Sequence, residues 1–486
     1  MSDPDAVSFR DRERLARTPA HETALDCLAA GIEAALPKRL IRDAVAVRDG
    51  TLRIAGVDGK GGEYDLDAYD RVILLGAGKA TTGAARALAD VLGENDREFD
   101  EGLVVTDGPP DGGSSGGSPA ATAIDVLPGD HPLPSERGVE GARRVLDAAE
   151  RAGPDDLVLA VITGGGSALL AAPAEPLSVD DLRALTTELL ASGASIDEIN
   201  AVRKHCSAVK GGQVARAVAP ATTVTLAVSD VIGDPLDTIA SGPTVPDPST
   251  YADALAVLDR YDLDVPEAVR ERLSSGAEGE IPETPTADDP AFDRSAAFVV
   301  GSGRTALDAA AGAAADRGYE PLVLSASVRG EAREAGTTHA AIAEECAARG
   351  SPVEPPAVLL SGGETTVTVG DAADPGTGGP NAEFVASAGL ALAEGPMGGE
   401  SEDDRSDDDP SVVVASVDTD GLDGPTDAAG AIADAATLDP DAARDALDRH
   451  DAYPLLDEAN ALLRTGPTGT NVNDLRAIVV EERDGE

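Results

Sequence analysis

The sequence of 486 residues contains few of the residues that disulfide-stabilised, metal-binding or membrane proteins require. Its three cysteines are far apart and form no C-x-x-C pair, so the sequence predicts neither a disulfide framework nor a zinc site. No apolar run approaches the roughly 18 residues of a transmembrane helix, and the N-terminal segment has no apolar core of the signal-peptide kind. We therefore expect a cytoplasmic protein with no membrane partner.

Large aromatic side chains are also rare. Tryptophan is absent and aromatic residues make up 2% of the chain, although 42% of the residues are hydrophobic. The core must therefore be built from Ala, Val, Leu and Ile. Basic residues are outnumbered, with 38 Lys and Arg against 89 Asp and Glu, and the formal net charge is -51. Such a charge repels phosphate backbones and anionic lipids, which excludes nucleic acids and membrane surfaces as partners.

The acidic residues are spread over the whole length, whereas lysine is nearly absent. The five lysines are Lys38, Lys60, Lys79, Lys204 and Lys210. Dispersed acidity with Arg favoured over Lys is typical of proteins adapted to a high-salt cytosol, where screening lets a large like charge coexist with a compact fold. The composition thus predicts a halophilic protein, in which each retained lysine deserves a functional explanation.

Short apolar runs alternate with segments of helical periodicity along the chain. Helices are predicted at 22–36 and 79–92, and strands at 71–75, 102–106, 157–163, 223–229, 297–301, 320–325, 356–361, 411–417 and 475–481. This alternation is typical of βαβ units and predicts an α/β fold with mainly parallel sheets.

Three polar stretches rich in Gly and Pro interrupt the pattern, at 107–120, 274–292 and 394–410. The second is the predicted linker between a larger, Rossmann-like domain over 20–273 and a smaller C-terminal domain over 293–482. The other two are predicted to be exposed loops or insertions, because their composition cannot form a core.

Glycine clusters follow predicted strands at four places: Gly76–Lys79, Thr163–Ser167, Ser361–Glu364 and Gly376–Gly379. Backbone N–H groups at such turns can bind phosphate or carboxylate, although glycine also serves ordinary tight turns. The candidate anion-binding residues for substrate are Gly164, Gly165, Gly166 and Ser167, and those for a nucleotide cofactor are Gly76, Gly78, Gly362 and Gly363. The fingerprints GxxxxGK[ST] and GxGxxG are absent, which argues against a P-loop NTPase and a standard dinucleotide-binding domain.

Charged residues at the ends of predicted strands form a second set of candidates. Asp230, Asp234 and Asp418 follow strands, where carboxylates commonly hold Mg²⁺ on a phosphate; the alternative is a solvated surface charge. Arg203 and Lys210 lie seven residues apart and would share a helix face that binds an anionic substrate. Salt bridges to surrounding acids are the alternative for both.

Nine motifs occur in one order along the chain: GAGKA, GDHPLP, TGGGSALL, NAVRKHCSAVKGGQ, SDVIGDPLDTIASGPTVPD, LSGGETTVTV, GGPNAEF, SVDTDGLDGPTDAAGA and TGPTGTNVNDL. Together they resemble the class II glycerate kinases, which join an N-terminal glycerate-kinase domain to a C-terminal MOFRL domain. The resemblance implies phosphorylation of D-glycerate by ATP, usually at the 2-hydroxyl to give 2-phosphoglycerate, with Mg²⁺ as cofactor.

The resemblance also implies site residues. The family's catalytic lysine corresponds to Lys79, and the arginine of its GGRNxE motif is replaced here by Pro380, next to the candidate nucleotide ligand Asn381. Either Arg203 or Arg304 supplies the missing charge, or that arginine is not essential. In the implied mechanism Lys79 and Mg²⁺ neutralise ATP, Arg203 holds the glycerate carboxylate, and Asp230 holds Mg²⁺ or accepts the hydroxyl proton.

Two other functions stay open at this point. Some relatives carry the label hydroxypyruvate reductase, an NAD(P)H-dependent activity against which the missing dinucleotide fingerprint argues. A non-catalytic ligand-binding protein is the third hypothesis. The expected partner is a small molecule, glycerate, and the oligomeric state is open, with a homodimer as one option.

We expect stability to depend on salt, because the Debye length grows from about 3 Å at 1 M to about 30 Å at 0.01 M salt and self-repulsion grows with it. Dialysis from molar KCl into millimolar buffer should unfold the protein, as followed by circular dichroism. An unchanged spectrum and melting temperature would contradict the halophilic interpretation.

Overall fold

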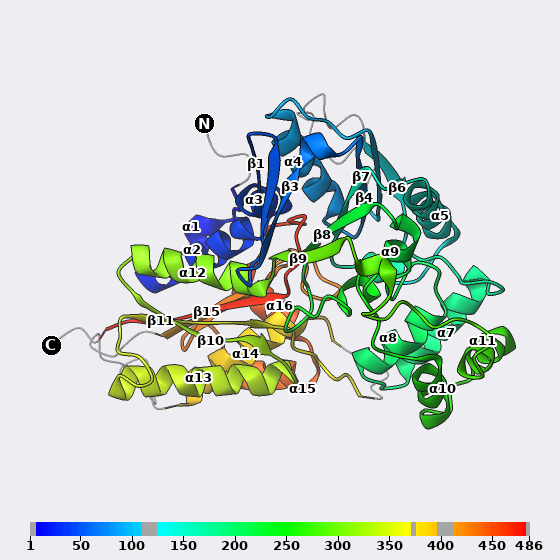
Figure 1. The fold of residues 1–486 in the computed structure, drawn as a ribbon. Helices are drawn as coiled ribbons and strands as arrows, with labels where there is room; N and C mark the ends of the chain where they lie inside the picture. Colours follow the sequence, from blue (N-terminus) through cyan, green and yellow to red (C-terminus); the bar gives the residue numbers. More distant parts are fainter. Residues whose placement is uncertain (1–5, 109–123, 371–375, 396–411, 483–486) are drawn as a thin grey trace, which may run out of the picture. The chain divides into compact units, whose positions relative to one another are not determined.

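The computed structural model describes residues 6–108, 124–370, 376–395 and 412–482. Contacts divide the chain into two compact units (Figure 1). The continuous unit comprises Pro37–Gly301, and the split unit combines Met1–Leu36 with Ser302–Glu486. This division differs from the predicted one, because the stretch 274–292 lies inside the continuous unit and is followed by a strand of that unit's sheet.

The continuous unit consists of strands and helices in alternation. Its strands are β1 (Val45–Arg48), β2 (Thr51–Ala55), β3 (Gly61–Asp65), β4 (Arg71–Ala77), β5 (Glu101–Thr106), β6 (Ile124–Pro128), β7 (Asp156–Ile162), β8 (Thr222–Val228) and β9 (Ser295–Gly301). Its α-helices are α3 (Pro37–Ala44), α4 (Thr81–Gly93), α5 (Glu136–Glu150), α6 (Gly166–Leu169), α7 (Val179–Ala191), α8 (Ile196–His205), α9 (Gln213–Val218), α10 (Tyr251–Arg260) and α11 (Glu267–Ala277). Short 3₁₀ turns are η1 (Leu66–Ala68), η3 (Ile239–Ser241) and η4 (Pro290–Phe292).

Six of these strands form one sheet in the order β6-β5-β4-β7-β8-β9, and all five neighbouring pairs are parallel. The strand order therefore reverses between β4 and β7. This is the doubly wound order of Rossmann-like domains, in which ligands bind at the carboxyl ends of the strands beside the reversal. The predicted Rossmann-like α/β arrangement is confirmed, and β1, β2 and β3 form a separate antiparallel sheet.

Helices cover both faces of the parallel sheet because its strands are apolar on both sides. Ile73 and Leu75 of β4 belong to an apolar cluster with Val145 of α5. On the opposite face, a Cβ on Gly76 would lie 2.6 Å from Cγ2 of Thr81 in α4. Glycine is thus needed at position 76 for the close approach of strand and helix.

A helical subcluster lies beside the sheet and includes α7, α8, α10 and α11. Leu185, Val202, Leu258 and Leu273 are among the buried residues of its core. Both α7 and α8 begin with a capping box, in which a serine (Ser178 in α7) bonds reciprocally with the carboxylate three residues later. These caps fix where the two helices start, and α7 and α8 carry one wall of the pocket described below.

The split unit also alternates helices and strands. Its helices are α1 (Arg12–Leu15), α2 (Pro19–Ala34), α12 (Gly303–Asp316), α13 (Ala332–Arg349), α14 (Pro380–Glu394), α15 (Pro440–Asp448) and α16 (Ala452–Glu458). Its strands are β10 (Glu320–Val328), β11 (Ala357–Gly363), β12 (Val412–Asp418), β13 (Gly430–Asp434), β14 (Leu462–Leu463) and β15 (Asp474–Val480).

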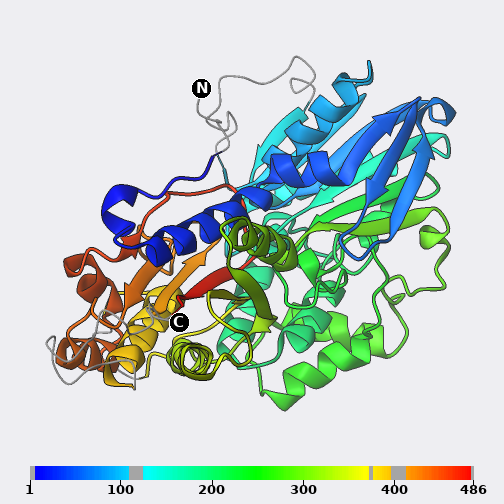
Figure 2. The ribbon, with the colours of Figure 1, turned by 90° about the vertical axis from the view of Figure 1, so that its left-hand side faces the viewer.

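The N-terminal helix α2 belongs to this unit, where it lies alongside α12 although the two are far apart in sequence (Figures 1 and 2). The contact is close at Gly31, because a Cβ there would lie 2.9 Å from the carbonyl oxygen of Ala306 in α12. The sequence analysis assigned this helix to the N-terminal domain, since periodicity predicts the apolar face of a helix but not what covers it.

The sheet of the split unit is mixed, with the order β10-β11-β15-β12-β13-β14. Only β10 and β11 pair in parallel; β15 lies antiparallel between β11 and β12, and β13 and β14 continue in antiparallel pairs. The prediction of parallel pairing therefore holds for the sheet of the continuous unit but not for this one. For β12 and β13 the physical reason is that they are joined without a crossover helix, and a direct connection of this kind favours antiparallel pairing.

The nine predicted strands are confirmed within a few residues at each end. Residue 411 and most of the stretches 107–120 and 394–410 lie outside the described residues. The sequence analysis missed β1, β2, β3, β6, β13 and β14, which are short. Within the described ranges, no helix has both the length and the apolar character needed to cross a bilayer.

Candidate active site

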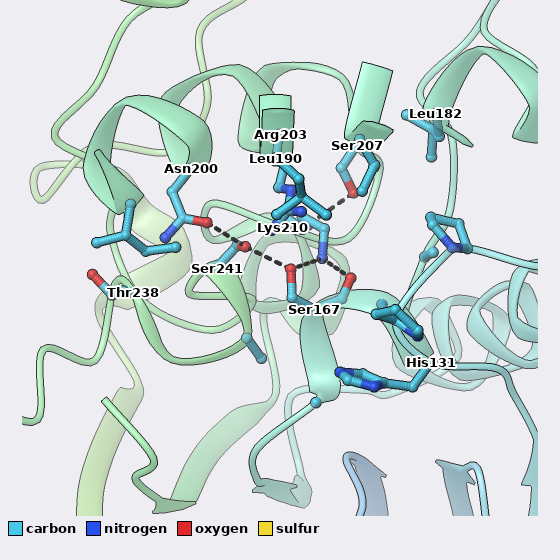
Figure 3. A pocket seen from close by; sticks show the side chains of 18 of the residues that line it. His131, Ser167, Leu182, Leu190, Asn200, Arg203, Ser207, Lys210, Thr238 and Ser241 are labelled. Atoms are coloured by element: carbon cyan, nitrogen blue, oxygen red, sulfur yellow. Dashed lines mark hydrogen bonds between the residues drawn. The ribbon is translucent and has the colours of Figure 1, made fainter. Parts of the chain in front are cut away.

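A pocket of about 290 Å³ lies in the continuous unit, at the carboxyl ends of the parallel strands. Its lining comes from the segments after β6, β7 and β8, from α7 and α8, and from the turn η3 (Figure 3). The lining includes apolar side chains, such as Leu182, Leu185 and Ile196, together with the polar side chains described below. This is the position at which doubly wound sheets bind their ligands.

Lys79 and Asp230 lie on two sides of the same glycine turn beside this pocket. The backbone N–H of Lys79 donates to the carbonyl oxygen of Gly164 over 2.9 Å, and a Cβ on Gly165 would lie 3.0 Å from Cγ of Lys79. A Cβ on Gly164 would overlap the carboxylate of Asp230. The two predicted catalytic residues are thus brought together by a turn that only glycine allows, and Gly165 itself has φ +77°.

The glycine turn also presents backbone donors. Among the described residues, no acceptor bonds the N–H groups of Gly164, Gly165 and Ser167, whereas the N–H of Gly166 donates to Thr163. Consecutive free N–H groups at the start of a helical turn form a concave site for anions. The N–H groups of Gly164, Gly165 and Ser167 are available to an anion and that of Gly166 is not, and the anion-binding role of Gly164 to Ser167 stays a prediction.

The charges around the turn shift two pKa values. Desolvation raises the pKa of Asp230 above its ordinary value, and the nearby Lys79 charge opposes part of that shift. Desolvation and the Lys79 charge both lower the pKa of His131, which lines the pocket and was interpreted from sequence as structural. A carboxyl group with a raised pKa is better suited to accept a proton than an ordinary surface aspartate.

Arg203 and Lys210 both line the pocket, but they do not share a helix face as the sequence predicted, because α8 ends at His205 and Lys210 lies in the turn beyond it. Among the described residues, Arg203 has no carboxylate partner, and desolvation lowers its pKa. Lys210 is 6% exposed, and burial together with the Arg203 charge lowers its pKa to about 7. Its Nζ donates to the carbonyl oxygen and to Oγ of Ser167, at 2.5 and 3.1 Å. A salt bridge is formed by the neighbouring Lys204 instead. This lysine is buried, and its Nζ lies 3.1 Å from Oδ1 of Asp247.

A chain of neutral side chains continues from Ser167 (Figure 3). Oγ of Ser167 lies 3.0 Å from Oγ of Ser241, which donates to Oδ1 of Asn200 over 2.9 Å. The sequence analysis did not select Asn200 or Ser241. The signal available for Asn200 was its position one helical turn before Arg203, on the same helix face.

The structure gives packing constraints for two further predicted residues near the site, and a position outside the pocket lining for a third. Gly76 is needed for strand–helix packing, and Gly78, at φ +137°, approaches Thr163 so closely that a side chain would clash. The N–H of Gly78 donates to Val105, so it is not free for a phosphate. Asp234 is not among the residues that line the pocket.

The remaining predicted residues belong to the split unit. Nδ2 of Asn381 donates to Asp423 and Asp474, and its Oδ1 accepts from Ser416, so all its hydrogen-bonding groups are used within the unit. The pKa of Asp418 is raised well above its ordinary value, first by burial and then by neighbouring carboxylates, Asp420 foremost.

Gly362 and Gly363 are the last residues of β11, where Gly363 has φ +127° and packs against the backbone of Val328. Pro380 occupies the first turn of α14, a position that favours proline. Of the two arginines suggested as replacements for the family arginine, Arg304 is paired with Asp308 at 2.7 Å, whereas Arg203 is unpaired in the described part of the chain.

No group of three or more His, Cys, Asp or Glu side chains in the described ranges is arranged to hold a metal ion. A resident all-protein metal site is therefore not formed by these residues. Mg²⁺ that arrives with a nucleotide needs fewer protein ligands, because one or two carboxylates suffice when phosphates and water complete the octahedron. Asp230 in the pocket meets that requirement.

The fold and the pocket together define a class: a two-unit α/β protein whose doubly wound sheet carries an anion-binding pocket with a lysine and an aspartate across a glycine turn. Comparison with known families narrows the class. Residues 23–274 match the family described as "Domain of unknown function (DUF4147)", and residues 357–474 match the MOFRL family.

Three relatives agree with this result. A glycerate 2-kinase of Pyrococcus horikoshii is 38% identical over 96% of this chain and 98% of its own. The crystal structure of a glycerate kinase of Thermotoga maritima has a TM-score of 0.77 and 36% identity, covering 94% of this chain and 99% of that one. A protein of Agrobacterium vitis with the provisional name hydroxypyruvate reductase is 43% identical over 84% of this chain and 87% of its own. The chain belongs to the class II glycerate kinase family, which joins a DUF4147 domain to a MOFRL domain.

The low pKa of Lys210 gives the pocket a pH dependence. Because this lysine is protonated below about pH 7 and neutral above it, the pocket loses a positive charge as pH rises through about 7. We expect sulfate, as a simple anion probe, to bind roughly fivefold to tenfold more weakly at pH 8 than at pH 6. Calorimetric titration measures this. Lys210→Met should remove the pH dependence, whereas Lys60→Met, at an exposed site, should not; equal sulfate affinity at both pH values in the unmodified protein would contradict the assignment.

Proposed function

We propose that this protein transfers the γ-phosphoryl group of ATP to D-glycerate, at the 2-hydroxyl, giving 2-phosphoglycerate and ADP, and that the pocket of the continuous unit binds the glycerate. The observation that carries the proposal is the gathering of Arg203, Lys210 and free backbone N–H groups in one pocket, with Lys79 next to Gly165 of its lining, in a chain of net charge -51. Positive charge concentrated in one place of so acidic a protein selects a small anion. The names of the relatives supply the kind of anion.

The substrate carboxylate is assigned to Arg203 and Lys210. Desolvation disfavours both cations in the absence of a ligand, and no carboxylate of the described residues compensates Arg203. An Arg guanidinium binds a carboxylate through two parallel hydrogen bonds, which fixes the orientation of a three-carbon acid. Binding of glycerate would thus supply the missing counter-charge and orient the 2-hydroxyl.

The chemical step is assigned to Asp230 and Lys79. The carboxylate of Asp230 accepts the proton of the 2-hydroxyl, and the oxygen of that hydroxyl forms a bond to the γ-phosphorus. The bond from the γ-phosphorus to the β–γ bridging oxygen breaks, and ADP is the leaving group. The raised pKa of Asp230 supports this role. Lys79 stabilises charge on the transferring group, because phosphoryl transfer depends mainly on positioning and electrostatics.

ATP and Mg²⁺ are cofactors in this proposal, and bound Mg²⁺ would neutralise the ATP phosphates. Holding the ion is the alternative role of Asp230, in which it does not accept the proton, and Asp234 and Asp418 stay predictions as further ligands. The nucleotide-binding roles of Gly76, Gly78, Gly362, Gly363 and Asn381 also stay predictions, although packing and internal hydrogen bonds already explain most of these residues. We also propose that the protein is cytoplasmic, halophilic and a homodimer.

A coupled assay tests the activity. ADP release that requires D-glycerate supports the kinase, NADH oxidation with hydroxypyruvate supports the reductase named for the Agrobacterium relative, and neither activity would support a ligand-binding protein. ³¹P NMR of the product distinguishes 2-phosphoglycerate from 3-phosphoglycerate and tests which hydroxyl reacts.

Lys79→Ala should reduce turnover by about 100-fold or more, which is the scale of one electrostatic contact in a transition state. The melting temperature should not change, because the side chain is exposed and makes no ion pair with any residue that the structure describes. Steady-state kinetics and thermal unfolding measure the two effects. A fully active Lys79→Ala enzyme would remove Lys79 from the mechanism.

Arg203→Ala should raise the KM for D-glycerate by about tenfold to 100-fold while the KM for ATP stays within about threefold, because a hydrogen-bonded charge is lost from the carboxylate site alone. The matched control is Arg216→Ala, since Arg216 lies outside the pocket and pairs with Asp289 at 2.9 Å. If both Michaelis constants stay unchanged in Arg203→Ala, the carboxylate must be held elsewhere.

A further inference from the structure

The hydrogen bonds between Lys210 and Asn200 run in one direction. Ser241 donates its one hydroxyl hydrogen to Oδ1 of Asn200, so Ser167 must be the donor in the contact between the two serines. The oxygen of Ser167 then accepts from Nζ of Lys210. Lys210 therefore donates to Ser167, Ser167 to Ser241 and Ser241 to the amide oxygen of Asn200, which accepts.

The end of this chain shows how the Asn200 amide is turned in the structure. Its oxygen faces Ser241 and its nitrogen points away from Ser241 (Figure 3). The side chain lines the pocket and is 4% exposed, and Nδ2 has no hydrogen-bond partner in the described part of the chain. A buried amide N–H₂ without an acceptor is unfavourable, and such groups in native proteins call for an explanation.

The other unused donors of the pocket point to the same kind of ligand. Arg203, three residues after Asn200 on α8, has no hydrogen-bond acceptor among the described residues. Nζ of Lys210 uses two of its three hydrogens on Ser167. Residues three apart lie on the same side of a helix, and both Asn200 and Arg203 line the pocket. A ligand with two acceptor oxygens and a negative charge satisfies both.

We propose that Asn200 is a specificity-determining residue: its Nδ2 donates to the substrate carboxylate that Arg203 pairs with, and the chain from Lys210 through Ser167 and Ser241 holds the amide in the orientation that presents this donor. The inference rests on the proposed function for the identity of the substrate, a 2-hydroxycarboxylate. Ser241 is a positioning residue, because it acts through Asn200.

Two substitutions at Asn200 test the donor. Asn200→Asp has nearly the same shape but replaces the N–H₂ group by an acceptor, so it should raise the KM for D-glycerate by about 100-fold; Asn200→Leu only removes the donor and should raise it by about tenfold. In both variants kcat should stay within about threefold and the KM for ATP should not change. Thermal unfolding shows whether each variant is folded, and Asn200→Leu, which buries no charge, keeps the test valid if Asn200→Asp does not fold.

Two further variants separate positioning from structure. Ser241→Ala should raise the KM for D-glycerate by about threefold to tenfold, because the amide loses its orienting partner but not its donor. Asp197→Asn changes one charge on the same helix at an exposed position outside the pocket, and should leave the kinetics unchanged. The proposal would be overturned if Asn200→Leu had the same KM for D-glycerate as the unmodified enzyme. It would also be overturned if only the KM for ATP rose, because that result would assign Asn200 to the nucleotide.

The failure of the proposed function would be visible separately. If the unmodified protein releases no ADP with D-glycerate, the kinase proposal fails. The role of Asn200 is then decided by calorimetric titration with D-glycerate and, as a control that lacks a carboxylate, with glycerol. Binding of D-glycerate but not glycerol that is lost in Asn200→Asp supports the carboxylate contact. Binding of neither compound, or equal binding of D-glycerate in both proteins, overturns it.

Discussion

The hydroxyl of Thr163 joins the two loops on which the pocket depends. It accepts from the N–H of Ala80 over 3.2 Å and lies 3.1 Å from the hydroxyl of Thr81, so the turn after β7 is bonded to the start of α4. Gly78 must approach Thr163 without a side chain. Because these loops follow β4 and β7, the strands where the sheet order reverses, this contact sets the place of Lys79 relative to Gly164 and Asp230. A doubly wound sheet has a crevice where the strand order reverses, and the Thr163 contact holds Lys79 next to the glycine turn in that crevice.

Charge pairing shows why the pocket is distinct in so acidic a chain. Two cations elsewhere in the continuous unit have carboxylate partners, since Lys204 pairs with Asp247 and Arg71 with Asp156. Arg203 and Lys210 are desolvated and have no carboxylate partner in the described ranges. Burial lowers the pKa of both groups, and the charge of Arg203 lowers that of Lys210 further. A desolvated cation without a counter-ion is unfavourable, and an anionic ligand removes that cost on binding.

The split unit concentrates the opposite charge. Burial, and after it the charge of Asp474, raises the pKa of Asp423 to about 7, and the pKa of Asp418 is shifted in the same direction. Part of this cluster has a structural role, because Asp423 accepts from the N–H groups of Asn381 and Ala382 at the start of α14. A carboxylate at a helix N-terminus is favoured by the helix dipole. The acidic motif of the sequence thus serves helix capping as well as any contact with a ligand.

The sequence by itself determined the nine longer strands, the α/β class, the family and the catalytic candidates, because apolar runs, glycine turns and motif spacing are local properties. It also contained an unused signal for β1 and β2, whose two-residue turn Asp49-Gly50 is typical of hairpins. Only the tertiary structure decided that α2 packs in the split unit, that β15 enters its sheet antiparallel, and that Ser241 orients Asn200. These depend on which distant segments cover an apolar face or meet in a hydrogen-bond chain, and such contacts leave no periodic trace in the sequence.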